Sequence, residues 1–291
     1  MPVAAGCFQC KGAEKKLNWL ITRVVPAATR CIVFFPGDIS DFANAQAPYH
    51  YSLEALTWVL AAKYPDDTLV VVKPRMMVEL FAVYVNFMFV DSTGNPRPRQ
   101  RRRSPGSTGA DEEDVVPAPP AAAHLEGLLQ SLEEQLEEAV PRTLVLVGFS
   151  KGAAVLNALL LDARESSFWS RCEAIHFIDA GLTVPGVFPA TREDLKELAK
   201  NVPQGFAIWL HFTPRQSQDE ARPFVAEEAE TFAERCKVAG LAIQRRDYFS
   251  QQLPSLDMHF DCLRCFQTSL DDEDDGDKHA GFFKAWGEKC A

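Results

Sequence analysis

The pentapeptide Gly148-Phe149-Ser150-Lys151-Gly152 is the segment of this sequence with the clearest chemical meaning. It follows a mostly apolar run from Thr143 to Val147 and precedes a stretch of small residues. The pattern G-x-S-x-G between a strand and a helix is typical of the sharp turn that holds a nucleophilic serine at the carboxyl edge of a sheet. The two glycines let the strand and helix backbones approach without a Cβ clash. The sequence therefore predicts Ser150 as a nucleophile for acyl transfer.

A serine hydroxyl reacts only when a histidine takes its proton and a carboxylate orients that histidine. The expected chain order is serine, acid, histidine, and His259 follows the last predicted strand in a predicted loop. The other five histidines fit less well: His50 and His124 precede the serine, His176 and His211 lie inside predicted strands, and His279 lies in an acidic tail. We therefore expect His259 to be the general base.

Two aspartates compete for the third position. Asp219 follows the second predicted strand after the serine and is the preferred acid, whereas Asp179 ends the first such strand and is the alternative. Each also has an ordinary interpretation, because Asp219 could simply begin a helix and Asp179 could form a tight turn with Gly181.

An oxyanion in this chemistry needs backbone donors. The expected donors are the N–H of Lys151, directly after the nucleophile, and the N–H of Asp38 or Ile39 in the loop after the strand predicted at 31–35. We expect the Lys151 side chain to reach solvent, the alternative being contact with an anionic group of a substrate. This chemistry requires no metal ion and no organic cofactor.

The elements that position these residues alternate between short apolar strands and helices. This alternation predicts an α/β fold of the α/β-hydrolase type, with a mostly parallel central sheet covered by helices on both faces. The expected strands are 31–35, 69–72, 143–147, 174–178, 206–212 and 241–248, and the expected helices are 53–64, 121–140, 152–163, 191–200 and 224–238. The class of segment 75–90 is left open.

Changes of composition divide the chain into one domain and three peripheral segments. The domain spans 24–268 and is interrupted at 91–120 by an insertion rich in Pro, Gly, Ser and Arg, which is expected to be disordered. Residues 269–291 form an acidic tail, expected to be disordered as well. Residues 1–23 are either a weak targeting segment or disordered.

Charge and cysteine content limit the classes of partner. A net charge of −10 over 291 residues argues against nucleic-acid binding. The two C-x-x-C pairs, at Cys7 and Cys262, are better explained by chance spacing of reduced thiols than by zinc. The apolar stretch from Val78 to Val90 is interrupted by polar residues and too short to span a bilayer. The expected partner is a small-molecule ester or thioester, and a protein partner is left open.

Several longer stretches resemble one family, the α/β-hydrolase-like proteins named after open reading frame 69 of human chromosome 2. The similar stretches include Phe34 to Asp38, Ser52 to Glu54, Tyr84 to Phe87, the pentapeptide at 148–152, Val155 to Asn157, Asp179 to Gly181, His211 to Gln216 with Asp219, and Pro254 to Phe260. The resemblance runs from about Val24 to Phe266 and omits the insertion. Together these stretches are far more specific than the pentapeptide.

The resemblance implies a serine-hydrolase-like fold and, in animals, a mitochondrial location connected with energy metabolism. If residues 1–23 are not an import signal, the expected location is the cytoplasm. The sequence favours a serine esterase, lipase or thioesterase that acts through an acyl-enzyme. A catalytically silent protein of the same fold with a binding or scaffolding role, and an acyltransferase, are the alternatives.

Overall fold

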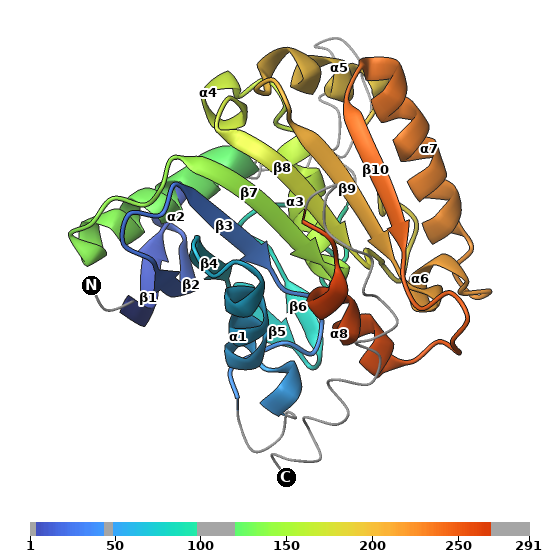
Figure 1. Ribbon diagram of the computed structural model, residues 1–291, viewed down its shortest axis with the longest axis horizontal. Coiled ribbons are helices and arrows are strands. Elements are labelled where there is room, and N and C mark those ends of the chain that lie inside the picture. Colours follow the sequence, from blue (N-terminus) through green and yellow to red (C-terminus); the bar gives the residue numbers. More distant parts are fainter. Residues whose placement is uncertain (1–3, 44–48, 98–119, 269–291) are drawn as a thin grey trace, which may run out of the picture.

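The computed structural model describes residues 4–43, 49–97 and 120–268, and its main feature is one mixed sheet (Figure 1). The strand order is β1-β2-β4-β3-β7-β8-β9-β10. Pairing is parallel from β4 through β10 and antiparallel where β2 joins β4 and β1. The strands are β1 (Ala4–Lys11), β2 (Leu17–Val24), β3 (Arg30–Phe35), β4 (Thr68–Val72), β7 (Thr143–Phe149), β8 (Cys172–Ile178), β9 (Ala207–Phe212) and β10 (Ala242–Asp247).

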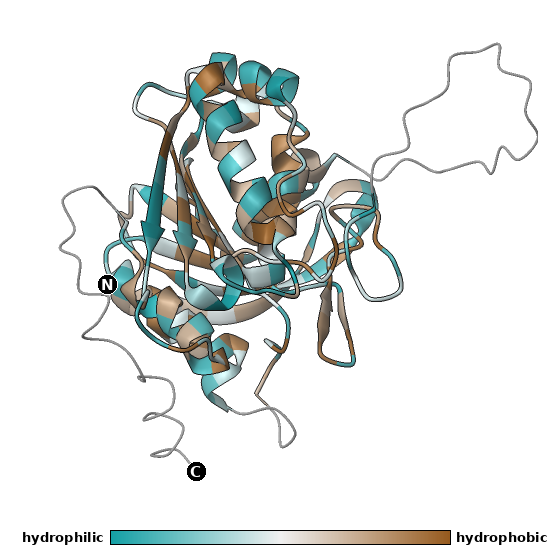
Figure 2. Ribbon diagram, turned by 90° about the vertical axis from the view of Figure 1, so that its right-hand side faces the viewer, coloured by the Kyte–Doolittle hydropathy of each residue, from teal (hydrophilic) through white to brown (hydrophobic). Residues whose placement is uncertain are grey.

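Helices cover both faces of this sheet, so apolar strand segments lie between two helix layers (Figure 2). One layer contains α2 (Ala121–Leu136), α3 (Ala153–Leu160), α5 (Arg192–Asn201) and α7 (Phe224–Ala239). The other contains α1 (Leu53–Lys63) and α8 (Leu256–Cys265). Short helices α4 (Ser166–Trp169) and α6 (Pro214–Ser217) lie in connections.

Alternate residues of the central strands enter two separate cores. In β3, Val33 and Phe35 pack with the first helix layer, whereas Ile32 and Phe34 pack with the second. A strand buried on both faces must be apolar at nearly every position, which explains the unbroken hydrophobic runs. The predicted α/β-hydrolase-like fold class, with a mostly parallel sheet and helices on both faces, is confirmed.

Side-chain caps fix the ends of several helices. Thr191 and Asp194 form a capping box at the start of α5, and Ser52 accepts a hydrogen bond from the Ala55 amide at the start of α1. Ser255 caps α8 in the same way through the Met258 amide. The loop predicted for the segment that carries His259 is therefore wrong, because this segment is a helix.

The amino-terminal segment is also more regular than expected. Residues 4–11 and 17–24 form β1 and β2, which pair along their whole length and extend the sheet beyond β4. Cys10 and Leu20 are buried in the core, so the expectation of disorder is wrong for these residues. The short alternation of buried and half-buried positions in β2 explains why composition alone missed it.

The segment around 75–97 forms a small structure at the edge of the domain. β5 (Met76–Val78) and β6 (Phe81–Val83) make a separate two-stranded sheet. Residues 91–97, the start of the predicted insertion, form a hydrogen-bonded turn with a bridge from Val90 to Pro96. The rest of the insertion, 98–119, and the acidic tail, 269–291, lie outside the described residues. Of the helices described, none is both long and apolar enough to cross a membrane.

Candidate active site

Ser150 occupies a strained turn between β7 and α3. Its φ angle is +53°, in the left-handed region that residues other than glycine rarely adopt. A Cβ added to Gly152 would lie 2.0 Å from the Phe35 carbonyl oxygen, and one added to Gly148 would lie 2.7 Å from Leu156 Cδ1. Both glycines are therefore needed for close backbone approach, as the pentapeptide predicts for a nucleophile elbow.

The loop after β3 lies directly against Ser150. A Cβ added to Gly37 would be 2.5 Å from Ser150 Cβ and 3.1 Å from Ser150 Oγ. The backbone of this loop is thus placed where an oxyanion donor is expected. The Ile39 amide donates to the Leu80 carbonyl oxygen over 2.7 Å. That bond occupies the Ile39 donor and leaves Asp38 as the candidate of the two, alongside the Lys151 amide.

His259 lies on α8, near the start of the helix, and only 5% of the residue is exposed. The aromatic ring of Phe149 faces the imidazole with a centroid separation of 4.4 Å. Since Phe149 immediately precedes Ser150, the histidine and the elbow are neighbours. The sequence signal that could have predicted a helix here is Ser255, a helix-capping residue directly before Leu256.

The carboxylate that contacts His259 is that of Asp179. His259 Nδ1 lies 2.6 Å from Asp179 Oδ2, and the aspartate is fully buried. The backbone N–H and the hydroxyl of Thr213 both donate to the Asp179 carboxylate over 2.7 Å. Three hydrogen bonds, two from Thr213 and one with His259, thus hold the carboxylate in a fixed orientation.

Asp219, the acid preferred from chain order, pairs with an arginine in place of His259. Its carboxylate forms an ion pair with Arg222 at 2.7 Å and accepts the Ala221 amide. The hydrogen bond and charge of Arg222 lower the pKa of Asp219 below its ordinary value. The structure therefore pairs His259 with the alternative, Asp179, and the preference for Asp219 is wrong.

Strand register explains why Asp179 takes this position. β8 pairs directly with β7, and Ile178 is the register partner of Phe149. Ser150 and Asp179 therefore leave neighbouring strands at the same level, about 4.8 Å apart in a typical sheet. Asp219 follows β9, which is one strand further away, and α6 lies between them in the chain.

Ser150 and His259 lie near each other in this structure but do not share a hydrogen bond. Within the described residues, no hydrogen bond joins Ser150 Oγ to His259, while His259 Nδ1 is bound to Asp179. Catalytic hydrogen bonds are often long in the absence of substrate and shorten in the complex. The structure thus brings together Asp179 and His259, with Ser150 adjacent to them.

His176 and His211 belong to the core of the domain. His176 Nδ1 lies 3.1 Å from His211 Nε2, and His211 Nδ1 lies 2.9 Å from the Tyr248 hydroxyl. Burial lowers the pKa of His211 well below its ordinary value, so this imidazole stays neutral at physiological pH. Both histidines are structural, as their position inside strands predicts.

The Lys151 side chain does not reach solvent, contrary to expectation. It is 2% exposed, and its ammonium group lies 3.1 Å from Asp38 Oδ1. It also donates to the Thr93 carbonyl oxygen over 3.0 Å. The sequence alone could not show this pair, because strand register is what places Asp38 beside the elbow.

Comparison with known sequences gives one family. A sequence model of the C2orf69 family matches residues 7–143 and 133–242. The relatives include the mitochondrial protein C2orf69 homolog of Danio rerio, 27% identical over 257 residues, which cover 81% of this chain and 72% of the relative. The mitochondrial protein C2orf69 of Homo sapiens is 23% identical over 286 residues, with 81% and 74% covered.

Solved structures of similar shape include esterases. A fungal esterase of Rhizomucor miehei superposes with a TM-score of 0.52 at 10% identity, covering 99% of this chain and 83% of the esterase. Carboxyl esterase 2 of Tuber melanosporum gives a TM-score of 0.51 at 11% identity, covering 99% and 86%. Identities this low establish the fold alone, which is the α/β-hydrolase fold.

Proposed function

Because the chain belongs to the C2orf69 family and has the α/β-hydrolase fold, we propose that it is a serine hydrolase acting on ester or thioester bonds. Ser150 is the nucleophile, His259 the general base and Asp179 the residue that orients the base. The buried 2.6 Å contact between His259 Nδ1 and Asp179, next to a strained serine turn, carries the proposal.

The reaction begins when Ser150 Oγ attacks the carbonyl carbon and His259 Nε2 takes the hydroxyl proton. Asp179 accepts the Nδ1–H, which keeps Nε2 free as the base and stabilises the imidazolium that forms. The negative charge on the carbonyl oxygen is stabilised by the backbone N–H groups of Lys151 and Asp38.

Collapse of this tetrahedral intermediate expels the alcohol or thiol, which receives the proton from His259, and leaves an acyl group on Ser150. Water, deprotonated by the same histidine, then attacks the acyl-enzyme, and the histidine returns the proton to Ser150 Oγ as the acid is released. No metal or organic cofactor takes part in these steps.

Labelling with a fluorophosphonate probe tests the proposal. The probe phosphonylates an activated serine, so we expect the wild-type protein to be labelled and Ser150→Ala to remain unlabelled, with equal circular dichroism spectra. A folded wild-type protein that takes no label would instead support a catalytically silent protein with a binding or scaffolding role. The absence of a hydrogen bond between Ser150 and His259, both within the described residues, is the observation that favours this second candidate.

We also place the protein in the mitochondrion, on the basis of its relatives' names. Subcellular fractionation of cells expressing the full chain with a carboxyl-terminal tag tests this location. Recovery of the protein in the cytosolic fraction would contradict it.

A further inference from the structure

The ammonium group of Lys151 is the least expected charge in the molecule. It is buried directly after the nucleophile, at the start of α3, where the helix dipole disfavours a cation. Its partners are the Asp38 carboxylate, the Thr93 carbonyl oxygen and the face of the Phe81 ring, 4.7 Å from the ring centroid. A buried charge is costly unless it is paired, so these contacts are needed to keep it there.

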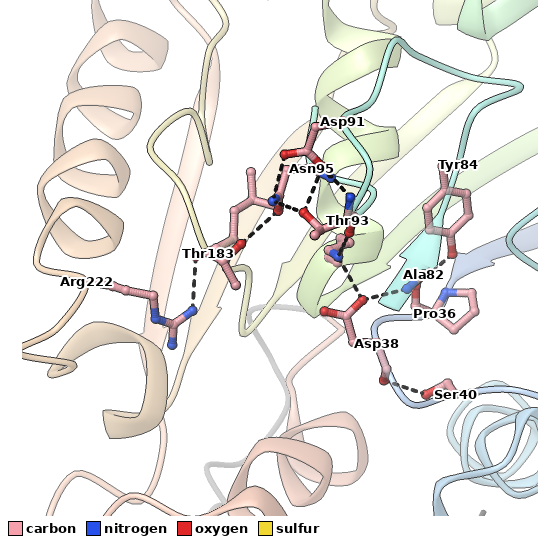
Figure 3. Close-up of polar contacts among 12 residues, drawn as sticks. Pro36, Asp38, Ser40, Ala82, Tyr84, Asp91, Thr93, Asn95, Thr183 and Arg222 are labelled. Atoms are coloured by element: carbon pink, nitrogen blue, oxygen red, sulfur yellow. Dashed lines mark hydrogen bonds and ion pairs between the residues drawn. The ribbon is translucent and has the colours of Figure 1, made fainter. Parts of the chain in front are cut away.

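The partner of this lysine, Asp38, lies in the loop after β3, and its own backbone N–H is the candidate oxyanion donor. The same oxygen that meets Lys151 accepts the Ala82 amide over 2.7 Å (Figure 3). The loop has two further anchors on the same segment: the Ile39 amide donates to the Leu80 carbonyl oxygen, and the Tyr84 hydroxyl donates to the Pro36 carbonyl oxygen. Among these contacts, only the ion pair with Lys151 attaches the loop to the Ser150 turn; the others attach it to residues 80–84.

Thr93 connects the lysine to the opposite side of the site. The Asp91 carboxylate accepts the amide and hydroxyl of Thr93 and the amide and side chain of Asn95. Asn95 in turn accepts a hydrogen bond from Thr183, in the connection that follows Asp179 (Figure 3). The contacts of Lys151 therefore join the oxyanion loop, the elbow and the segment after the acid.

We propose that Lys151 is a positioning residue whose side chain, paired with Asp38, holds the loop at 36–39 against the Ser150 turn and so fixes the oxyanion site. The inference rests on the proposed function. It assigns the Lys151 side chain a task separate from that of its backbone amide. Without the ion pair the loop keeps its other anchors, so the protein folds, but the Asp38 amide is no longer held in register with the nucleophile.

The test measures fluorophosphonate labelling over a range of probe concentrations, which separates the limiting rate from the probe affinity. The variants are Lys151→Met, which keeps the length of the side chain, Asp38→Asn, which keeps its shape, and the double variant. The matched control is Asp67→Asn, which breaks the ion pair between the buried Asp67 carboxylate and the partly exposed Arg30 at the opposite end of β3. Thermal unfolding of every variant is recorded in parallel.

We expect each single variant to lower the limiting rate at least about tenfold, less than the roughly 100-fold or more lost with an oxyanion donor. The probe affinity should change less than about threefold, and the double variant should be no slower than the singles, since one change already breaks the pair. The control should label at the wild-type rate. If Lys151→Met does not fold, the labelling rate of Asp38→Asn tests the proposal. The Asp38 side chain is 27% exposed, so this substitution should disturb folding less.

Two failures are distinguishable. An unlabelled wild-type protein refutes the proposed function. A labelled wild-type protein whose Lys151→Met and Asp38→Asn variants keep limiting rates within threefold refutes the positioning role alone. A control that slows as much as these variants also refutes it, because loss of an ion pair elsewhere in the domain would then explain the effect.

Discussion

Asp179→Asn separates the role of the buried carboxylate from its part in the fold. Asparagine has the same shape, and its oxygen can still accept the Thr213 amide. Its NH₂ group, however, faces His259 Nδ1 in place of an acceptor. The imidazole must then present a lone pair at Nδ1 and carry its hydrogen on Nε2, where it cannot take the proton of Ser150.

The expected loss follows from that change of tautomer. Wrong-tautomer substitutions in serine triads lower the rate about 10⁴-fold, and we expect a loss of this size in the rate of hydrolysis of a p-nitrophenyl ester. Stability should change by only about 1–3 kcal/mol, because most hydrogen bonds keep a partner. For a domain of this size that is about 2–12 °C in melting temperature.

Asp219→Asn is the matched control. Its ion pair with Arg222 is partly exposed, so its loss should alter stability by at most about 1 kcal/mol, and the esterase rate should stay within about threefold. A near-normal rate in Asp179→Asn, with a collapse in Asp219→Asn, would refute the assignment made from the structure. Normal rates in both would refute a carboxylate role altogether.

Three further predictions follow from particular contacts. His259→Asn keeps a donor toward Asp179 but lacks the base, so ester hydrolysis should vanish while the melting temperature stays within about 5 °C; retained hydrolysis would refute the role of base. Gly152→Ala should destabilise the protein in urea unfolding by several kcal/mol, more than Gly148→Ala, because its Cβ meets a carbonyl oxygen whereas Leu156 can move; equal effects would contradict the elbow geometry. Burial lowers the pKa of His124 from 6.5 to about 4. Because the imidazole binds a proton more readily in the unfolded chain, the full free energy of unfolding is present above pH 6.5 and decreases below that pH by about 1.4 kcal/mol per pH unit. Urea unfolding at pH 7 and pH 5 should show a smaller decrease in the free energy of unfolding for His124→Phe than for the wild-type protein. An equal decrease in both proteins would contradict this prediction.

The parts of the site that depend on local chemistry could be predicted from the sequence. The turn at Ser150 follows from two glycines at fixed spacing between a strand and a helix. The α/β class follows from apolar runs of strand length that alternate with helices, and the start of α5 follows from the box formed by Thr191 and Asp194.

The parts that depend on which strands are neighbours could not be predicted. Chain order slightly favours Asp219 over Asp179, and only the direct pairing of β8 with β7 places Asp179 beside the elbow. The burial of Lys151 likewise requires Asp38, more than a hundred residues earlier, to arrive at the same sheet edge. The strands β1 and β2 gain their stability from pairing with each other and with β4, which composition does not reveal.

The most direct test of the account is to detect the acyl group on Ser150. The protein is mixed rapidly with p-nitrophenyl acetate and quenched, and the acid-stable adduct is located by peptide mass spectrometry. The account predicts a burst of p-nitrophenol approaching one equivalent, one acetyl group on the peptide that contains Ser150, and neither signal in Ser150→Ala. A folded wild-type protein that releases p-nitrophenol no faster than Ser150→Ala, with no acetyl group on that peptide, would contradict it.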